Sequence, residues 1–266
     1  MIPKPSARRR PTRDLPFRLR RAAALTVACL AASAPGGATA DAAPRVVELF
    51  TSHGCSSCPP AEALFARLVE DEPGLVALEY HVDYWDALVH GADGSFADPF
   101  SSPAHTARQR RYAEAGLAGR VGVYTPQLVV DGRAALVGSD ARRLRRALAA
   151  PRPDPTVSIR LVPDPSGRRL RAEIDASAAD GSVDGAEIVL VRYLDEARTE
   201  ITGGENRHRT AVNHRVVRAV EPLGGVPADG ATRRVEFDAP ADGEGCAVLV
   251  QDRALAALHG AALCPP

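Results

Sequence analysis

Two cysteines, Cys55 and Cys58, are the residues of this chain whose type and spacing point most directly to chemistry. They are two residues apart, so they can close a small disulfide ring, and they follow an apolar run at 46–50 that is typical of a buried strand. Pro59 and Pro60 come next and fit the first turn of a helix, where a missing N–H costs little. A thiol at a helix N-terminus is stabilised as thiolate by the helix dipole and the free N–H groups. The pattern therefore predicts thiol–disulfide exchange, with Cys55 as the exposed attacking sulfur and Cys58 as the more buried resolving sulfur.

The competing interpretation is a disulfide that stays closed in an exported protein. Ser56 and Ser57 lie between the two cysteines and add no charge that would tune them. His53 lies two residues before Cys55 and as an imidazolium would stabilise its thiolate. A solvated loop histidine is the alternative for that position.

Three residues after the predicted strand at 75–82 are candidates for supporting roles. Asp83 supplies a carboxylate that can help proton transfer to Cys58, or it caps a turn. Tyr84 and Trp85 can form an apolar rim for a substrate peptide, or they pack inside a loop.

A soft-metal site is a second hypothesis for the same region. Thiolates together with the imidazoles of His53 and His81 would suit copper(I) or zinc. Nothing in the sequence brings both histidines to the sulfurs, and His81, inside a strand pattern, is better explained as a core residue. Glu62 on the first predicted helix is interpreted as a solvated residue. We therefore assign no metal ligands and expect no cofactor.

The first 40 residues have the features of a cleaved export signal. A leader with eight basic residues precedes an apolar stretch at 22–34, which is too short for a permanent membrane span, and Ala38-Thr39-Ala40 forms a small-x-small cleavage pattern. We expect cleavage near Ala40, a periplasmic or secreted mature protein, and no stable membrane span.

Charge restricts the partners of that mature protein. The whole chain has 33 basic and 33 acidic residues, of which the leader holds eight and one, leaving 25 basic and 32 acidic residues. A net charge near −7 disfavours nucleic acid and anionic membranes, which require a basic surface. The predicted partners are protein thiols or disulfides and an unidentified redox partner.

Four cysteines remain after cleavage, an even number that fits disulfides in an exported protein. Cys246 and Cys264 flank the last predicted strands, and we expect them to form a structural disulfide. Cys55 and Cys58 are then the reactive pair.

The first half of the mature chain alternates strand and helix patterns. Strands are predicted at 45–50 and 75–82, helices at 59–70, 102–115 and 140–149, and a hairpin at 127–130 and 134–137 joined by Asp131-Gly132. The order is β-α-β-α-β-β-α. Three prolines at 151–155 then break the pattern. We predict a first domain at 41–150, a linker at 151–155 and a second domain at 156–266.

The second half has almost only strand patterns. They fall at 156–161, 170–174, 188–191, 214–220, 235–237 and 247–250, at intervals typical of a β-sandwich. The turn at 203–206, Gly-Gly-Glu-Asn, is either ordinary loop chemistry or an edge of the active cleft. A third hypothesis makes the sandwich a binding module and the first half an inert scaffold.

With this order of elements, the first half resembles the thioredoxin fold. A CxxC motif opens the first helix, and Thr125-Pro126 stands directly before the hairpin. The resemblance implies that this proline is cis, that its loop lies against the two sulfurs and that it presents a backbone edge to substrate. It also implies an insertion between Asp83 and Pro99.

A closer resemblance is to the exported family called domain of unknown function 1223. The segments that carry it are 47–61 around the CxxC motif, 81–86, 124–127, 130–133 and 204–206. The family implies a thioredoxin-like domain and no established reaction. His53, where glutamine is common, and the pair Cys246 and Cys264 depart from the family pattern.

Overall fold

The structure is a computed structural model, and residues Asp41–Pro266 form one compact unit within it. The predicted export signal at 1–40 lies outside the described residues. The described ranges are 44–89, 96–119, 122–179, 183–227, 229–255 and 257–265.

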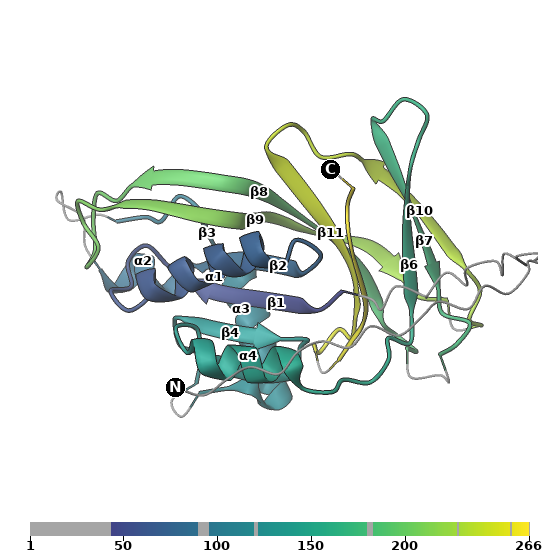
Figure 1. The fold of residues 1–266 in the computed structure, drawn as a ribbon, viewed down its shortest axis with the longest axis horizontal. Coiled ribbons are helices and arrows are strands. Elements are labelled where there is room, and N and C mark those ends of the chain that lie inside the picture. Colours follow the sequence, from purple (N-terminus) through teal and green to yellow (C-terminus); the bar gives the residue numbers. More distant parts are fainter. Residues whose placement is uncertain are drawn as a thin grey trace, which may run out of the picture. The chain divides into compact units, whose positions relative to one another are not determined.

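The first half builds one side of a large sheet (Figure 1). Its strands are β1 (Val46–Thr51), β2 (Val76–Val82), the short β3 (Ser101–Ser102), β4 (Gln127–Val130) and β5 (Ala134–Val137). β1 runs parallel to β2 and antiparallel to β4, and β4 pairs with β5 in a hairpin. The short β3 pairs in parallel with the end of β2.

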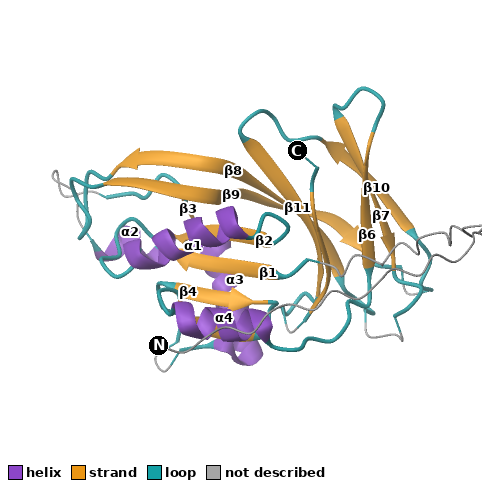
Figure 2. Ribbon diagram, viewed as in Figure 1, coloured by secondary structure: helices purple, strands orange, loops and turns teal. Residues whose placement is uncertain are grey.

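The helices lie on both faces of this sheet (Figure 2). They are α1 (Pro59–Asp71), α2 (Tyr84–Leu88), α3 (Pro103–Tyr112), the π-helical turn η1 (Ala113–Leu117) and α4 (Ala141–Ala149). Phe65 of α1 and Leu144 of α4 pack with Leu49 of β1 on one face. Tyr112 of α3 packs with Phe50 of β1 on the other face, because neighbouring residues of a strand point to opposite sides.

The second half continues the same sheet. Its strands are β6 (Ser158–Pro163), β7 (Arg169–Asp175), β8 (Glu187–Glu200), β9 (Thr210–Gly225), β10 (Arg233–Asp238), β11 (Glu244–Gln251) and β12 (Leu258–Leu263). β9 pairs with β2 at Glu79 and Val216, giving the strand order β12-β11-β8-β9-β2-β1-β4-β5, while β10, β7 and β6 form a separate small sheet.

The two separate domains predicted around 151–155 therefore differ from the observed arrangement. The elements expected in the first half are present, with α2 added in the predicted insertion at 83–99 and β3 directly after it. The sheet, however, runs from one half into the other. The physical reason is that β2 is buried on both faces and its free edge needs a partner, which β9 supplies. The chain has a mixed α/β fold with one large sheet and few helices.

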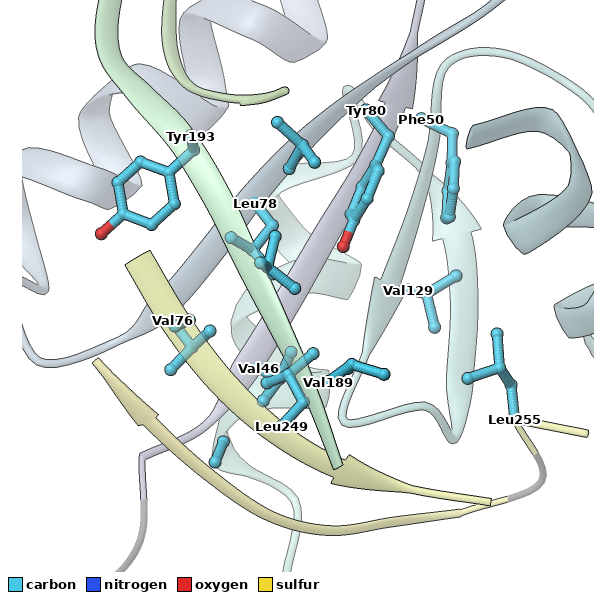
Figure 3. Packing of buried hydrophobic residues seen from close by; sticks show 14 of the residues in the cluster. Val46, Phe50, Val76, Leu78, Tyr80, Val129, Val189, Tyr193, Leu249 and Leu255 are labelled. Atoms are coloured by element: carbon cyan, nitrogen blue, oxygen red, sulfur yellow. The ribbon is translucent and has the colours of Figure 1, made fainter. Parts of the chain in front are cut away.

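Strand β11 and the first part of β8, residues 188–191, are buried on both faces because they separate two cores. Val189 and Leu249 point toward β1 and β2, where Figure 3 shows them beside Val46. Their neighbours Ile188 and Val250 point to the opposite side and pack against the small sheet. Cys246 and Cys264 form a disulfide across β11 and the end of β12, with 5.2 Å between their Cα atoms.

A buried ion pair joins α3 to the sheet. The Nε atom of Arg108 donates to Glu48 Oε1 at 2.6 Å, and its Nη1 atom donates to Gln251 Oε1 of β11 at 3.0 Å. Tyr112 also hydrogen-bonds to Glu48. Because Arg108 contacts both β1 and β11, it connects elements from the two halves of the chain.

Candidate functional site

The CxxC motif occupies the turn between β1 and α1. Cys58 is the N-cap residue of α1, and its carbonyl accepts hydrogen bonds from the amides of Ala61 and Glu62. The Cys58 amide donates to the Cys55 carbonyl at 3.2 Å, which closes a tight turn around both thiols. The sequence pattern thus correctly predicts where the pair sits relative to the strand and the helix.

Both cysteines are unpaired thiols, and both are buried. Cys55 is only 1% exposed, so the prediction of an exposed attacking sulfur is wrong for this conformation. The preceding residue, Gly54, is closely packed: a Cβ atom there would lie 3.1–3.3 Å from Val89, Phe96 and Trp85. These contacts place the loop beneath residues that follow β2.

The two thiols differ strongly in acidity. A hydrogen bond from Cys58 lowers the pKa of Cys55 to about 6, with help from the Ser57 hydroxyl, whose Oγ lies 3.2 Å from Cys55 Sγ, and from Thr125. Burial, together with the hydrogen bond to Cys55, raises the pKa of Cys58 well above its ordinary value. Cys55 is therefore the thiolate of the pair, and Cys58 holds the proton.

Thr125 and Pro126 lie beside this pair. Their peptide bond is cis, as the resemblance implies. Trp85 Nε1 donates to Thr125 Oγ1 at 2.7 Å, so the indole is fixed against the loop before β4. Burial raises the pKa of Tyr84, whose hydroxyl donates to Gln109. Both aromatic side chains are half-buried at the site.

Asp83 does not contact the cysteines in the way the sequence pattern suggests. Its Oδ1 atom accepts a hydrogen bond from the Thr106 hydroxyl at 2.5 Å, which ties α2 to α3. The carboxylate beside Cys58 belongs to Glu62, because one turn of helix brings position 62 back toward position 58. Thr51 Oγ1 donates to Glu62 Oε1 at 2.6 Å and also hydrogen-bonds to Cys58.

Glu62 is thus part of the site, whereas the sequence pattern predicted a solvated residue on the helix surface. Burial raises its pKa to about 7, and the nearby charge of Glu79 adds to that effect. The usable signal was its spacing of four residues from Cys58 on the predicted helix.

The turn at 203–206 between β8 and β9 packs directly on the CxxC loop. Asn206 Nδ2 donates to the carbonyls of His53 at 3.0 Å and Cys55 at 2.7 Å. Glu205 Oε2 accepts from the Ser56 amide at 3.0 Å. Gly204, with φ of +69°, comes so close that a Cβ atom there would lie 3.0 Å from Gly54 Cα. The second half of the chain therefore holds the backbone of the motif.

His53 is buried, so a solvated loop histidine is excluded for this structure. Its ring meets that of His81 edge-on, with 4.8 Å between ring centroids. Burial lowers the pKa of His53, which makes it neutral at pH 7 and removes the imidazolium that was expected to stabilise Cys55.

The partner of both imidazoles is Asp98. His81 Nδ1 lies 2.8 Å from Asp98 Oδ2, and the His53 amide donates to the same oxygen at 2.7 Å. Burial opposes protonation of His81, but Asp98 and Glu79 outweigh it and raise its pKa to about 10. His81 is a core histidine, as predicted, and it is part of a buried polar cluster that the sequence did not reveal.

A cavity of about 420 Å³ lies between α1 and the β8–β9 hairpin, next to this cluster. His53, Glu62 and Asn206 line it together with Arg209. Neither cysteine lines it, so the cavity borders the helix side of the site.

The described residues thus define a mixed α/β protein with a buried, asymmetric dithiol at the end of a central strand. The chain belongs to the family described as "Protein of unknown function (DUF1223)", whose model matches residues 46–251. It is similar to the crystal structure of protein AGR_C_4864 from Agrobacterium tumefaciens, with 28% identity over 84% of this chain and 94% of that chain and a TM-score of 0.63.

HBP35 of Porphyromonas gingivalis is a more distant match, with 14% identity, coverage of 83% of this chain and 74% of that chain, and a TM-score of 0.47. No curated protein matches the chain. Among the described helices, none has the length and apolar character needed to cross a membrane.

Proposed function

We propose that this protein is an exported, thioredoxin-like thiol–disulfide oxidoreductase that acts on protein thiols or disulfides. The observation that carries the proposal is the pair of free thiols at the start of α1, where the interaction with the Cys58 thiol lowers the pKa of Cys55 to about 6. Cys55 is thereby the thiolate that attacks, and Cys58 is the protonated thiol that later resolves the mixed disulfide. Thiol–disulfide exchange requires these two roles.

The arrangement of the first half supports the thioredoxin-like assignment. The first half has the strand order β2-β1-β4-β5, with α1 and α4 on one face of the sheet and α3 on the other. This arrangement agrees with the predicted element order β-α-β-α-β-β-α, which resembles the thioredoxin fold. Thr125, two residues before β4, contacts Cys55. The second half, with its small sheet packed on β8 and β11, supplies the sandwich-like part.

The exchange reaction balances with these two thiols alone when a substrate disulfide is present. The Cys55 thiolate attacks one substrate sulfur, forming a mixed disulfide and releasing the other substrate sulfur as a thiolate that takes up a proton. Cys58 then loses its proton and attacks Cys55 in the mixed disulfide. The substrate leaves as a dithiol, and the protein holds a Cys55–Cys58 disulfide. Read in reverse, the same steps oxidise a substrate dithiol.

Glu62 is the group best placed to accept the proton of Cys58. The Thr51 hydroxyl connects the two side chains, and the pKa of Glu62, about 7, lets it exchange protons near neutral pH. A carboxylate with an ordinary pKa would be a weaker base for a buried thiol.

Access to Cys55 requires movement, because its sulfur is buried in this conformation. The segments that have to part are the 203–206 turn and the residues after β2, which pack on Gly54 from two sides. Loop displacement of this kind is common where a site closes over its chemistry.

The soft-metal alternative, with both histidines joining the sulfurs, has less support. The rings of His53 and His81 face Asp98, whereas the contacts of Cys55 are with Cys58, Ser57 and Thr125. The hypothesis of a binding module on an inert scaffold predicts a dithiol without redox activity, and the same experiment tests it.

The test is a trapping experiment with Cys58→Ser, which leaves Cys55 without its resolving partner. We expect this variant to accumulate mixed disulfides with thiol proteins of the exported compartment, and Cys55→Ser to accumulate none. A wild-type Cys55–Cys58 couple should titrate reversibly with a glutathione redox buffer. If the wild-type disulfide resists reduction and the Cys58→Ser variant captures nothing, the pair is a disulfide without redox activity and the proposal fails.

A further inference from the structure

Three buried side chains beside the dithiol direct their donor atoms at one another. His53, His81 and Asp98 are each at most 3% exposed, and one donor atom of each lies within 4.8 Å of the others. Both Nδ1 atoms face the same carboxylate: His81 Nδ1 lies 2.8 Å from Asp98 Oδ2, and His53 Nδ1 lies 3.5 Å from Asp98 Oδ1.

His53 Nδ1 has no hydrogen-bond partner within the part of the chain that the structure describes. Its contact with Asp98 is not aligned as a hydrogen bond, although the atom is fully buried. A buried polar atom without a partner is rare in native proteins and often marks a missing ion or water.

The far sides of both rings face polar groups of the kind that stand behind metal-binding histidines. His53 Nε2 lies within hydrogen-bond distance of Asn213 Oδ1, at 3.0 Å, whereas His81 Nε2 faces Glu79 Oε1 at 3.3 Å without an aligned hydrogen bond. Asn213 Nδ2 in turn donates to Glu79 Oε1 at 2.6 Å. A carboxylate or amide behind a histidine fixes its tautomer and directs the other nitrogen at the ion.

Two of the three spacings between the donor atoms approach those of a small transition-metal ion, and the widest, up to 4.8 Å, would have to close by roughly 1.4 Å. Bonds of about 2.0–2.1 Å in a tetrahedral zinc site place neighbouring ligand atoms roughly 3.3–3.4 Å apart. The distance of 3.5 Å from His53 to Asp98 already matches this value. The His81 contact of 2.8 Å is a hydrogen bond and would widen by roughly 0.5 Å when an ion replaces its proton.

Charge favours the same occupant. Glu79 and Asp98 are two buried carboxylates beside two imidazoles, a combination that a divalent cation neutralises. Imidazole nitrogens with a carboxylate oxygen suit borderline divalent ions such as Zn²⁺.

We propose that His53, His81 and Asp98 bind one divalent transition-metal ion of the zinc type, independently of the two cysteines. Asn213 and Glu79 orient the imidazoles from behind. Three protein ligands leave a fourth position for water or a small ligand, which is the pattern of exchangeable zinc sites rather than of closed structural ones. His53 also lines the cavity of about 420 Å³, which neither His81 nor Asp98 lines. This inference does not rest on the proposed redox function.

The experiment is a titration of the purified, chelator-treated protein with Co²⁺ alone, followed by competition with Zn²⁺. We expect one bound ion per chain, visible ligand-field bands, and no sulfur-to-cobalt charge-transfer band. The Cys55→Ser/Cys58→Ser variant should bind equally well. His53→Gln should lose most of the affinity, and Asn213→Ala should weaken binding by about 10- to 100-fold through the orientation of His53.

His259→Gln is the matched control, because His259 pairs with Asp252 outside the cluster and its loss should leave binding unchanged. Circular dichroism and the thermal midpoint of each metal-free variant establish that it folds. The proposal is overturned if wild-type protein binds no Co²⁺, if His53→Gln binds as tightly as wild type, or if a sulfur charge-transfer band appears and disappears with the cysteines.

Discussion

The ionisation of Cys55 gives the sharpest test of the dithiol. Its pKa of about 6 is set first by the hydrogen bond from the Cys58 thiol, and then by the Ser57 and Thr125 contacts. Removing the donor with Cys58→Ala should therefore move the titration of Cys55 upward, toward that of an ordinary cysteine near 8.5.

The magnitude shows which observable to use. With a pKa of about 6, Cys55 is about 90% thiolate at neutral pH, against about 3% for an ordinary cysteine, a gain of about 30-fold. Lower basicity reduces the intrinsic nucleophilicity of the thiolate by about 10-fold, which leaves a net advantage of only about 2- to 3-fold. Near pH 5.5 the same arithmetic gives about 20-fold. Burial of the sulfur slows its reaction with every reagent. The midpoint of the pH titration of Cys55 is therefore informative, and its reaction rate at neutral pH is not.

The assay is the ultraviolet absorbance of the thiolate as a function of pH, which needs no reagent to reach the sulfur. The reduced Cys55→Ser protein supplies the blank. We expect a midpoint near 6 for wild type, a clear rise for Cys58→Ala, a smaller rise for Ser57→Ala, and no change for the exposed Ser56→Ala control. A wild-type midpoint between about 8 and 9 would refute the reasoning, because it would mean that the thiol–thiol hydrogen bond does not form.

Three further predictions concern the surroundings of the pair. The pKa of Glu62 rises from 4.5 to about 7 on folding, so its carboxyl contributes stability that is present below pH 4.5 and lost as pH rises through 7. Glu62→Gln should therefore raise the thermal midpoint of unfolding above pH 7 but not at pH 4.5. The same variant should slow the resolution of a mixed disulfide at Cys55, measured by stopped-flow assays. Asn206→Ala should lower the free energy of unfolding by about 1–3 kcal/mol, measured with urea, and speed alkylation of Cys55, since two buried carbonyls lose their donor; unchanged alkylation would argue against the turn as a cover. Replacing both Cys246 and Cys264 by serine should cost about 3 kcal/mol in the same urea assay, from the 18-residue separation that the disulfide closes, without moving the Cys55 titration.

Local signals predicted local structure well. The hairpin of β4 and β5 followed from two apolar runs and the Asp131-Gly132 signal, and both of these residues have positive φ, 50° and 64°. The loop is one residue longer than the two-residue turn that was predicted, because Val130 pairs with Ala134. The Cys55–Cys58 motif likewise followed from strand and helix patterns that need no distant contact. These features are determined within about ten residues of chain.

Long-range pairing was not visible in the sequence. The second half was predicted as its own sandwich because its strands alternate, and only 188–191 and 214–220 were assigned within β8 and β9. The outer part of that hairpin is too polar to show as a strand pattern. It is ordered by contacts with α1 and with the CxxC loop, and pairing partners over more than a hundred residues leave no local trace.

The polar cluster was missed for a related reason, although one signal was available. Glu79 and His81 are two residues apart in an otherwise apolar strand, so they share a face, which is unusual for a buried strand without a partner for them. Parallel pairing places Thr51 opposite His81 and so brings His53 to the same end of the sheet. Asp98 and Asn213 come from segments whose position depends on the whole fold, and no spacing rule predicts them.

The dependence of the site on both halves changes how its function should be tested. A fragment ending at residue 150 lacks Asn206 and Glu205, the two side chains that hydrogen-bond to the CxxC backbone. It also lacks β9, which covers the edge of β2, and Gln251, which binds the buried Arg108. Such a fragment would lose redox activity by unfolding whether or not the second half takes part in the reaction. The full chain with Asn206→Ala separates the two cases, because it loosens the turn at 203–206 while leaving the sheet and the Arg108 ion pair in place.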